Sequence, residues 1–142
     1  EALLRLLEIR RTLEIDVVRK ATIKATPAQR EDIGRLCTAL LVDVDAGLPW
    51  RKADHAFHGA IYDASGNPMY GQLLVNLDNA LERGGESPFS ADAFGLDSFP
   101  IHKDLAEAML AENPDAAVDA ISRIIDVVER EVQAIIDGRK AG

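Results

Sequence analysis

Apolar residues return every three or four positions along most of this chain, which is the spacing of one face of an α-helix. The first 24 residues carry the pattern at Leu3, Leu6, Leu7, Leu13, Val17 and Val18. The pattern stops at Thr26 and Pro27, where a residue that can cap a helix precedes one that suits the first helical position. We therefore expect one helix over about 1–24 and a second that starts at Pro27.

Further stretches with the same spacing are separated by turn-forming residues. The second helix should end near Asp45, before the loop AGLPW, and a third should cover about 51–64. Asn67 and Pro68 then provide a cap and a first residue for a fourth helix, which should continue to about Arg83.

The last part of the chain predicts two more helices after a long irregular stretch. Residues 84–100 contain Gly, Pro, Ser and three Phe, which predicts a loop that can serve as a lid over a site. A fifth helix should cover about 98–113 and a sixth about 114–137, with Gly138 ending it. No stretch alternates as a strand does, so we expect an all-α fold, an antiparallel bundle of about six helices joined mostly by short connections.

Composition and charge narrow the function. The chain has 142 residues, which suits a single domain over 1–142, and its formal net charge of −8 disfavours direct binding to nucleic acid. Its single cysteine, Cys37, excludes an internal disulfide and lies in an apolar helical stretch, where a small core residue is expected. Neither a leader-like segment nor an uncharged apolar run of about 20 residues is present, so we expect a cytoplasmic protein with no membrane association.

The stretch DHAFHGAIYDASGNP contains the first candidate site. Asp54 and His58 lie four residues apart, so both side chains emerge from one face of the third helix. A carboxylate oxygen with an imidazole nitrogen suits Zn²⁺, Ni²⁺, Mn²⁺ or Fe²⁺, although such a pair is more often a surface hydrogen bond. His55 points to another side and should face solvent. His102, near the start of the fifth helix, is either a further ligand or a helix-start residue with no special role.

Two arginines stand in the otherwise apolar first helix. Because Arg10 and Arg11 are adjacent, one of them must lie nearer the core, where a guanidinium needs an anionic partner. That partner is either an internal carboxylate, such as Glu14 or Asp54, or the carboxylate of a bound ligand. The alternative is a surface pair between Arg10 and Glu14.

Three blocks of the sequence resemble one known family. EIRRTLEIDVVRKATIKATP (8–27) is similar to an E-x-R-x-x-L-E opening followed by A-x-x-A-T. ADHAFHGAIYDASGNPMY (53–70) is close to D-x-x-F-H-x-x-I-x-x-A-S-G-N-P. IHKDLAEAMLAENPDAAVDAI (101–121) is similar to H-x-x-[IL]-x-x-A-[IM]-x-x-x-[DN]-x-x-A-A. The chain thus resembles the FCD domain, the effector-binding C-terminal domain of FadR-type GntR transcription regulators.

The resemblance implies a dimerising bundle of six to seven helices and a pocket for a small organic acid. In many family members, one Asp and three His hold a divalent metal in that pocket. Asp54, His58 and His102 match the Asp and two of the His, and Ile124, in AISRI, stands where the third His is expected. Arg10 matches the arginine of the opening motif and is expected to meet the carboxylate of the effector.

The resemblance also implies a winged helix-turn-helix domain N-terminal to this one, absent from this sequence, through which a homodimer would bind DNA. We therefore expect an effector-sensing and dimerisation domain of a bacterial regulator, and not an enzyme. Two alternatives remain: a helical-bundle metal-dependent enzyme that uses the same donors, and a structural dimerisation module with a non-functional pocket.

Overall fold

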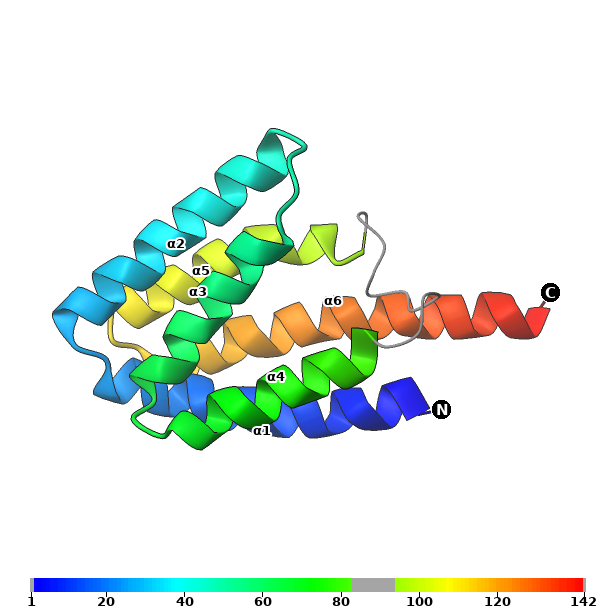
Figure 1. The fold of residues 1–142 in the computed structure, drawn as a ribbon, viewed down its shortest axis with the longest axis horizontal. Helices are drawn as coiled ribbons and strands as arrows, with labels where there is room; N and C mark the ends of the chain where they lie inside the picture. The colour runs from blue at the N-terminus through cyan, green and yellow to red at the C-terminus, as the bar shows by residue number, and fades with distance from the viewer. Residues whose placement is uncertain (1, 83–93, 142) are drawn as a thin grey trace.

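A computed structural model describes residues 2–82 and 94–141 and confirms the all-α fold for them. These residues form six α-helices and one short 3₁₀ helix (Figure 1). The elements are α1 (Ala2–Lys24), α2 (Pro27–Asp45), α3 (Arg51–Ala64), α4 (Pro68–Glu82), η2 (Leu96–Ser98), α5 (Phe99–Leu110) and α6 (Pro114–Ala141).

The helices pack as an antiparallel bundle around α1 and α6, which run side by side in opposite directions (Figure 1). α5 packs on α6 and on α2, while α3 contacts both α1 and α2. α4 packs on α1 and α3. α3 and α5 both pack on α2, so their buried faces can bring side chains to a common point.

Local sequence sets the helix starts. The Thr26 hydroxyl accepts a hydrogen bond from the Gln29 amide at 3.1 Å, and the Gln29 side chain accepts one from the Thr26 amide at 2.9 Å. This reciprocal pair satisfies two amide donors, one at the helix start and one of the cap residue itself. At the start of α4, the Asn67 side-chain oxygen accepts a hydrogen bond from the Met69 amide at 3.0 Å. Both predicted caps are confirmed.

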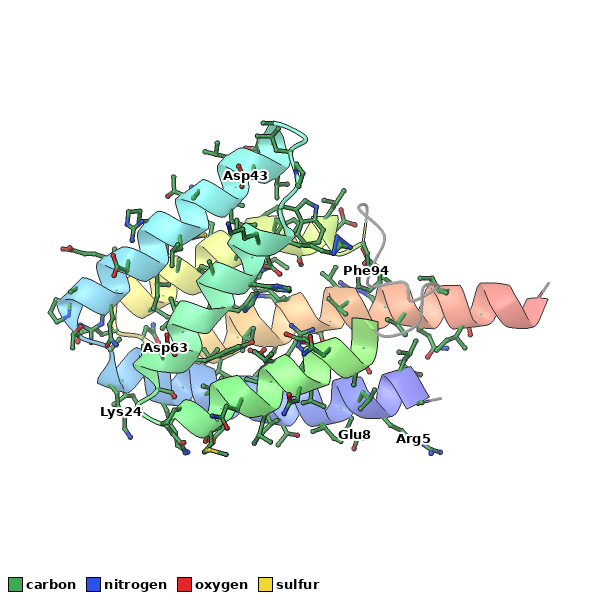
Figure 2. All side chains as sticks on the ribbon, viewed as in Figure 1. Arg5, Glu8, Lys24, Asp43, Asp63 and Phe94 are labelled. Atoms are coloured by element: carbon green, nitrogen blue, oxygen red, sulfur yellow. The ribbon has the colours of Figure 1, made fainter. Side chains whose placement is uncertain are left out.

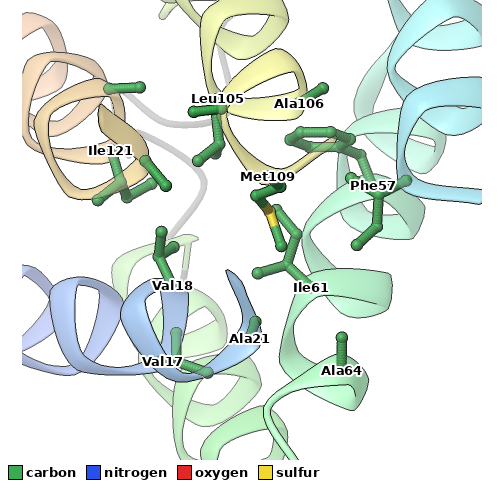
Figure 3. Packing of buried hydrophobic residues seen from close by; sticks show 14 of the residues in the cluster. Val17, Val18, Ala21, Phe57, Ile61, Ala64, Leu105, Ala106, Met109 and Ile121 are labelled. Atoms are coloured by element: carbon green, nitrogen blue, oxygen red, sulfur yellow. The ribbon is translucent and has the colours of Figure 1, made fainter. Parts of the chain in front are cut away.

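The main core forms where α1, α3, α5 and α6 converge (Figure 3). Its fully buried members include Val17, Val18, Phe57, Ile61, Leu105, Met109 and Ile121. Each such large side chain contributes about 1.5–3 kcal/mol through removal from water. Cys37 is 3% exposed and belongs to this core, as predicted. Charged residues such as Arg5, Glu8 and Lys24 lie on the outside (Figure 2).

A smaller apolar cluster fills the other end of the bundle. Its buried members are Leu7, Leu81, Phe94, Val132 and Ile136. It joins α1, α4 and α6 and also anchors the segment that leads into η2. This cluster explains why α6 extends so far along the chain.

Two predicted helix ends are wrong. α6 does not end at Gly138 but continues to Ala141, because a helical glycine costs only about 1 kcal/mol and the preceding turns are anchored by Val132 and Ile136. α5 ends at Leu110 and not at Asn113. There, Glu112 adopts the left-handed conformation with a φ of 55°, and the Asn113 amide bonds back to the Ala108 carbonyl.

The expected loop over 84–100 lies mostly outside the described residues. From Phe94 onward the chain makes a turn at Gly95, whose φ is 79°, and then forms η2. The Gly95 amide donates a hydrogen bond to a Glu131 carboxylate oxygen on α6 at 2.8 Å. This contact fixes the approach to α5, which begins at Phe99 as the sequence predicts.

Candidate metal centre and ligand pocket

Two helices bring three potential metal ligands together. Asp54 and His58 come from one face of α3, and His102 comes from the first turn of α5. The two histidines are 7% and 2% exposed, respectively. One donor atom from each of the three residues lies within 4.8 Å of the others.

The three donor atoms form a nearly regular triangle. His58 Nε2 lies 3.2 Å from His102 Nε2, and each of these nitrogens lies 3.2 Å from Asp54 Oδ1. Asp54 Oδ1 is buried and makes no hydrogen bond of good geometry within the described residues. Two ring nitrogens and a carboxylate oxygen that all face one point are an unfavourable packing arrangement unless a proton or a cation lies between them.

A backbone carbonyl orients the His102 ring. His102 Nδ1 lies 2.8 Å from the Ser98 carbonyl oxygen in η2. A carbonyl can only accept, so Nδ1 must carry the hydrogen, and the neutral ring then presents an Nε2 lone pair to the centre of the triangle. Such an outer hydrogen bond is the usual way to hold a metal-binding histidine in one tautomer.

The groups of the triangle shift the pKa values of Asp54 and His58. Burial alone would raise the pKa of Asp54, but His58 and His102 lower it well below its usual range. Burial lowers the pKa of His58, and the Asp54 carboxylate more than offsets this, so the net pKa is raised. The carboxylate is therefore ionised and ready to accept a cation.

The donor set fits a divalent metal. In a tetrahedral zinc site with bonds of about 2.0–2.1 Å, neighbouring ligand atoms are about 3.3 Å apart, close to the spacing of this triangle. Three protein donors leave a fourth position open, as in sites that bind an exogenous ligand. Ile124 of α6 lines the same cavity and is 5% exposed, so α6 contributes an apolar contact there.

The triangle lies against a cavity of about 90 Å³. Aromatic rings form much of its wall: the Phe99 ring centroid is 5.1 Å from that of His102 and 4.7 Å from that of Trp50. Phe57 packs on the other side, with its centroid 5.3 Å from that of His58. These rings cover the two histidines, which are nearly shielded from water, and so strengthen electrostatic interactions there.

Of the two adjacent arginines in α1, Arg10 is the one that lines this cavity. Its Nε lies 3.6 Å from Glu14 Oε1, and its Nη1 lies 3.6 Å from Asp78 Oδ1 on α4. Burial alone would lower the pKa of Arg10, but the negative charges of Asp78 and Glu14 outweigh this effect. The net pKa is raised, so the side chain stays charged. Glu14 is 0% exposed and accepts a hydrogen bond from the Tyr62 hydroxyl at 2.5 Å.

The remaining candidates from the sequence do not take part in the triangle. Arg11 points away from the cavity and forms ion pairs with Asp126 and Glu129 on α6 at 2.8 and 2.7 Å. His55 is exposed, as predicted, and lies at the edge of the cavity.

Sequence reasoning did not identify Ser98, Tyr62 or Asp78. Ser98 acts through a backbone carbonyl, which any residue could supply. The other two become relevant only because α3 and α4 pack on α1 beside Arg10. The position of Ser98, four residues before His102, was the one signal available.

Comparison with known proteins shows the family to which this chain belongs. The FCD domain family matches residues 5–127, which is most of the chain. The chain belongs to the FCD domain family. A GntR protein of Streptococcus agalactiae has a similar structure, with a TM-score of 0.75 and 26% sequence identity. The match covers 89% of this FCD domain and 57% of the streptococcal chain, so this chain corresponds to only part of that protein.

Two negative findings complete the comparison. No curated protein matches this sequence at a significant level. Within the described part of the FCD domain, no helix combines the length and apolarity that crossing a membrane requires.

Proposed function

We propose that this FCD domain is the effector-sensing and dimerisation domain of a bacterial GntR/FadR-type transcription regulator. The observation that carries the proposal is the triangle of Asp54, His58 and His102 beside Arg10 in one cavity. The similarity to the streptococcal GntR protein supports the same assignment. DNA would be bound only through a separate N-terminal domain, in keeping with the net charge of −8 on this one.

The proposed ligand is a small carboxylate, held together with a divalent metal such as Zn²⁺, Ni²⁺ or Mn²⁺. Asp54, His58 and His102 would hold the metal, and Arg10 would meet the carboxylate. A bound metal supplies a Lewis-acidic position that attracts a carboxylate oxygen. Ile124 leaves coordination positions to the ligand that a fourth protein donor would fill.

We favour a sensor over an enzyme. The acidic and basic groups beside the triangle are already engaged: Arg10 pairs with Glu14 and Asp78, and the Glu14 carboxylate accepts a hydrogen bond from Tyr62. Such groups bind and orient a ligand, whereas a reaction would need a base or nucleophile that can change its protonation state. Binding would act by shifting the population of conformers in a cytoplasmic homodimer.

Metal content tests the proposal directly. Wild-type protein, His58→Ala and His55→Ala are each incubated with Zn²⁺, desalted and analysed for metal. His55 is the matched control, because it is an exposed histidine of the same helix. We expect about one Zn²⁺ per chain in the wild type and in His55→Ala, and little in His58→Ala. Equal metal in all three proteins, or none in the wild type, would contradict the metal site.

Substitutions on α4 test the proposed dimer. Met69 and Leu73 are 52% and 48% exposed and lie one turn apart, so they form an apolar strip on one face of that helix. We expect Leu73→Glu to be a monomer by analytical ultracentrifugation, while Val75→Glu, on a different face and 53% exposed, remains a dimer. A monomeric wild type would refute the dimer, and dimers in both variants would refute this face.

A further inference from the structure

Among the described residues, Arg10 forms ion pairs with two acids, and both contacts are long. The distances from its guanidinium to Glu14 and to Asp78 are each 3.6 Å, which is within range for ionic attraction but too long for a hydrogen bond. Arg10 Nε is buried and has no hydrogen-bond partner among the described residues. Neither acid therefore satisfies the guanidinium fully, so a carboxylate that enters the cavity can compete with Asp78 for it.

Glu14 and Asp78 differ in how easily each can move away from Arg10. Glu14 is completely buried, lies on the same helix as Arg10 and is held by the Tyr62 hydroxyl. Asp78 comes from α4, its side chain is 22% exposed and it lines the cavity. A ligand carboxylate that approaches Arg10 therefore meets Asp78 as a competitor, while Glu14 remains in place.

The formal charge around Arg10 favours displacement of Asp78 by a ligand carboxylate. Arg10 with Glu14 and Asp78 carries a formal net charge of −1, which opposes a second carboxylate at the same guanidinium. If Asp78 moves aside, Arg10 and Glu14 are neutral together, and an incoming carboxylate restores the original charge. Exchange of Asp78 for a ligand carboxylate therefore leaves the formal charge around Arg10 unchanged, whereas addition of the ligand without this exchange would make it more negative.

Asp78 also helps to fix α4 on the bundle. The hydroxyl of Tyr70, in the first turn of α4, contacts the Asp16 carboxylate and accepts a hydrogen bond from Lys20 at 2.7 Å, both on α1. The Arg10–Asp78 pair ties the second half of α4 to the same helix. Without the Arg10–Asp78 pair, the contacts described here that hold this half of α4 are apolar, chiefly those of Leu77 and Leu81.

We propose that Asp78 is a built-in competitor for Arg10: a ligand carboxylate displaces it, so that Asp78 sets the ligand affinity of the pocket and reports occupancy to α4. This inference rests on the proposed function, because it takes the ligand to be a carboxylate that meets Arg10. Asp78 is a positioning and specificity residue here, and it does not need to touch the ligand.

The affinity part is tested with acetate as the probe. Zn²⁺-treated wild type, Asp78→Asn and Asp63→Asn are titrated by calorimetry. Asp63, labelled in Figure 2, is exposed on α3 and provides the same change of charge away from Arg10. We expect acetate to bind Asp78→Asn about tenfold more tightly than wild type, within the range of ordinary coupling between sites, with no change in Asp63→Asn. Equal affinities in the two variants, or no acetate binding by Asp78→Asn, would overturn the inference.

The coupling part needs a readout that a general change of charge would not move. Amide hydrogen exchange over residues 75–82 should speed up in the wild type when acetate is added. In Asp78→Asn, exchange there should be fast already and should not respond to acetate. A wild-type α4 whose exchange is unaffected by bound acetate would refute the coupling.

Metal analysis of the same samples separates the two proposals. If the wild type holds Zn²⁺ and Asp78→Asn shows no gain in acetate affinity, only the competitor role fails. If the wild type holds no metal and none of the proteins binds acetate, the proposed function fails together with it.

Discussion

The buried carboxylate of Glu14 allows a stability prediction that uses two tyrosines as a matched pair. Tyr62 donates a 2.5 Å hydrogen bond to this carboxylate, which is 0% exposed. Burial, together with the negative charge of Glu14, raises the pKa of Tyr62 well above its usual value, so the hydroxyl remains a donor. Tyr62→Phe keeps the ring and removes only this donor.

The loss of stability in Tyr62→Phe can be estimated from the contacts that the Glu14 carboxylate would keep. Among the described residues, Glu14 would retain the 3.6 Å attraction to Arg10 alone, and its Oε2 is already without a hydrogen-bond partner there. A hydrogen bond to a charged group contributes about 1.5–3 kcal/mol, and no new apolar contact compensates. We expect Tyr62→Phe to lower the free energy of unfolding by about 2 kcal/mol, which corresponds to a fall in Tm of roughly 6 °C for a domain of this size.

Tyr70→Phe is the control. Its hydroxyl also contacts a carboxylate, that of Asp16, and Lys20. These partners are 48% and 43% exposed, so water can replace the lost contacts and the cost should stay below about 0.5 kcal/mol.

Urea denaturation followed by circular dichroism, in the presence of a chelator, measures both variants without a contribution from metal. Equal losses in the two variants, or a loss below about 0.5 kcal/mol for Tyr62→Phe, would refute the reasoning about the buried carboxylate.

Three further predictions follow from single residues. Burial raises the pKa of Cys37 to about 11, so iodoacetamide at pH 8 should label the folded protein at least about 100-fold more slowly than the urea-unfolded chain; comparable rates would contradict burial of the thiol. Thr26→Ala should lower the free energy of unfolding by about 1 kcal/mol, because the Gln29 amide loses its acceptor; a loss below about 0.3 kcal/mol in urea titrations would mean that the cap is unimportant. Gly138→Ala should raise it by up to about 1 kcal/mol, because α6 continues through this position, whereas a destabilised variant would indicate a helix end there.

Local patterns in the sequence predicted most of the fold. Apolar spacing gave all six helices, and the residues at Thr26 and Asn67 marked two of the starts. The error at Gly138 has a tertiary cause, since packing of Val132 and Ile136 outweighs the helix-ending tendency of glycine. Such packing depends on residues distant in the chain, so no local rule could reveal it.

Some residues of the candidate site could likewise be placed by local geometry, and others only by tertiary packing. Helical geometry alone placed Asp54 and His58 on one face, because four residues separate them. His102 is 44 residues from His58, so its approach to 3.2 Å depends on how α3 and α5 pack. The resemblance to a family supplied that link. The position of Asp78 beside Arg10 had no counterpart in the sequence motifs, because it depends on the angle at which α4 crosses α1.

The distance along the chain between the two histidines has a consequence for folding. A metal bound by both would close a loop of 44 residues that contains all of α4. In a chain-entropy model, a cross-link of that length restricts the unfolded state by about 4 kcal/mol at 25 °C. A bound metal would therefore stabilise the folded domain as a reversible cross-link, and its removal by a chelator would lower the free energy of unfolding by a comparable amount.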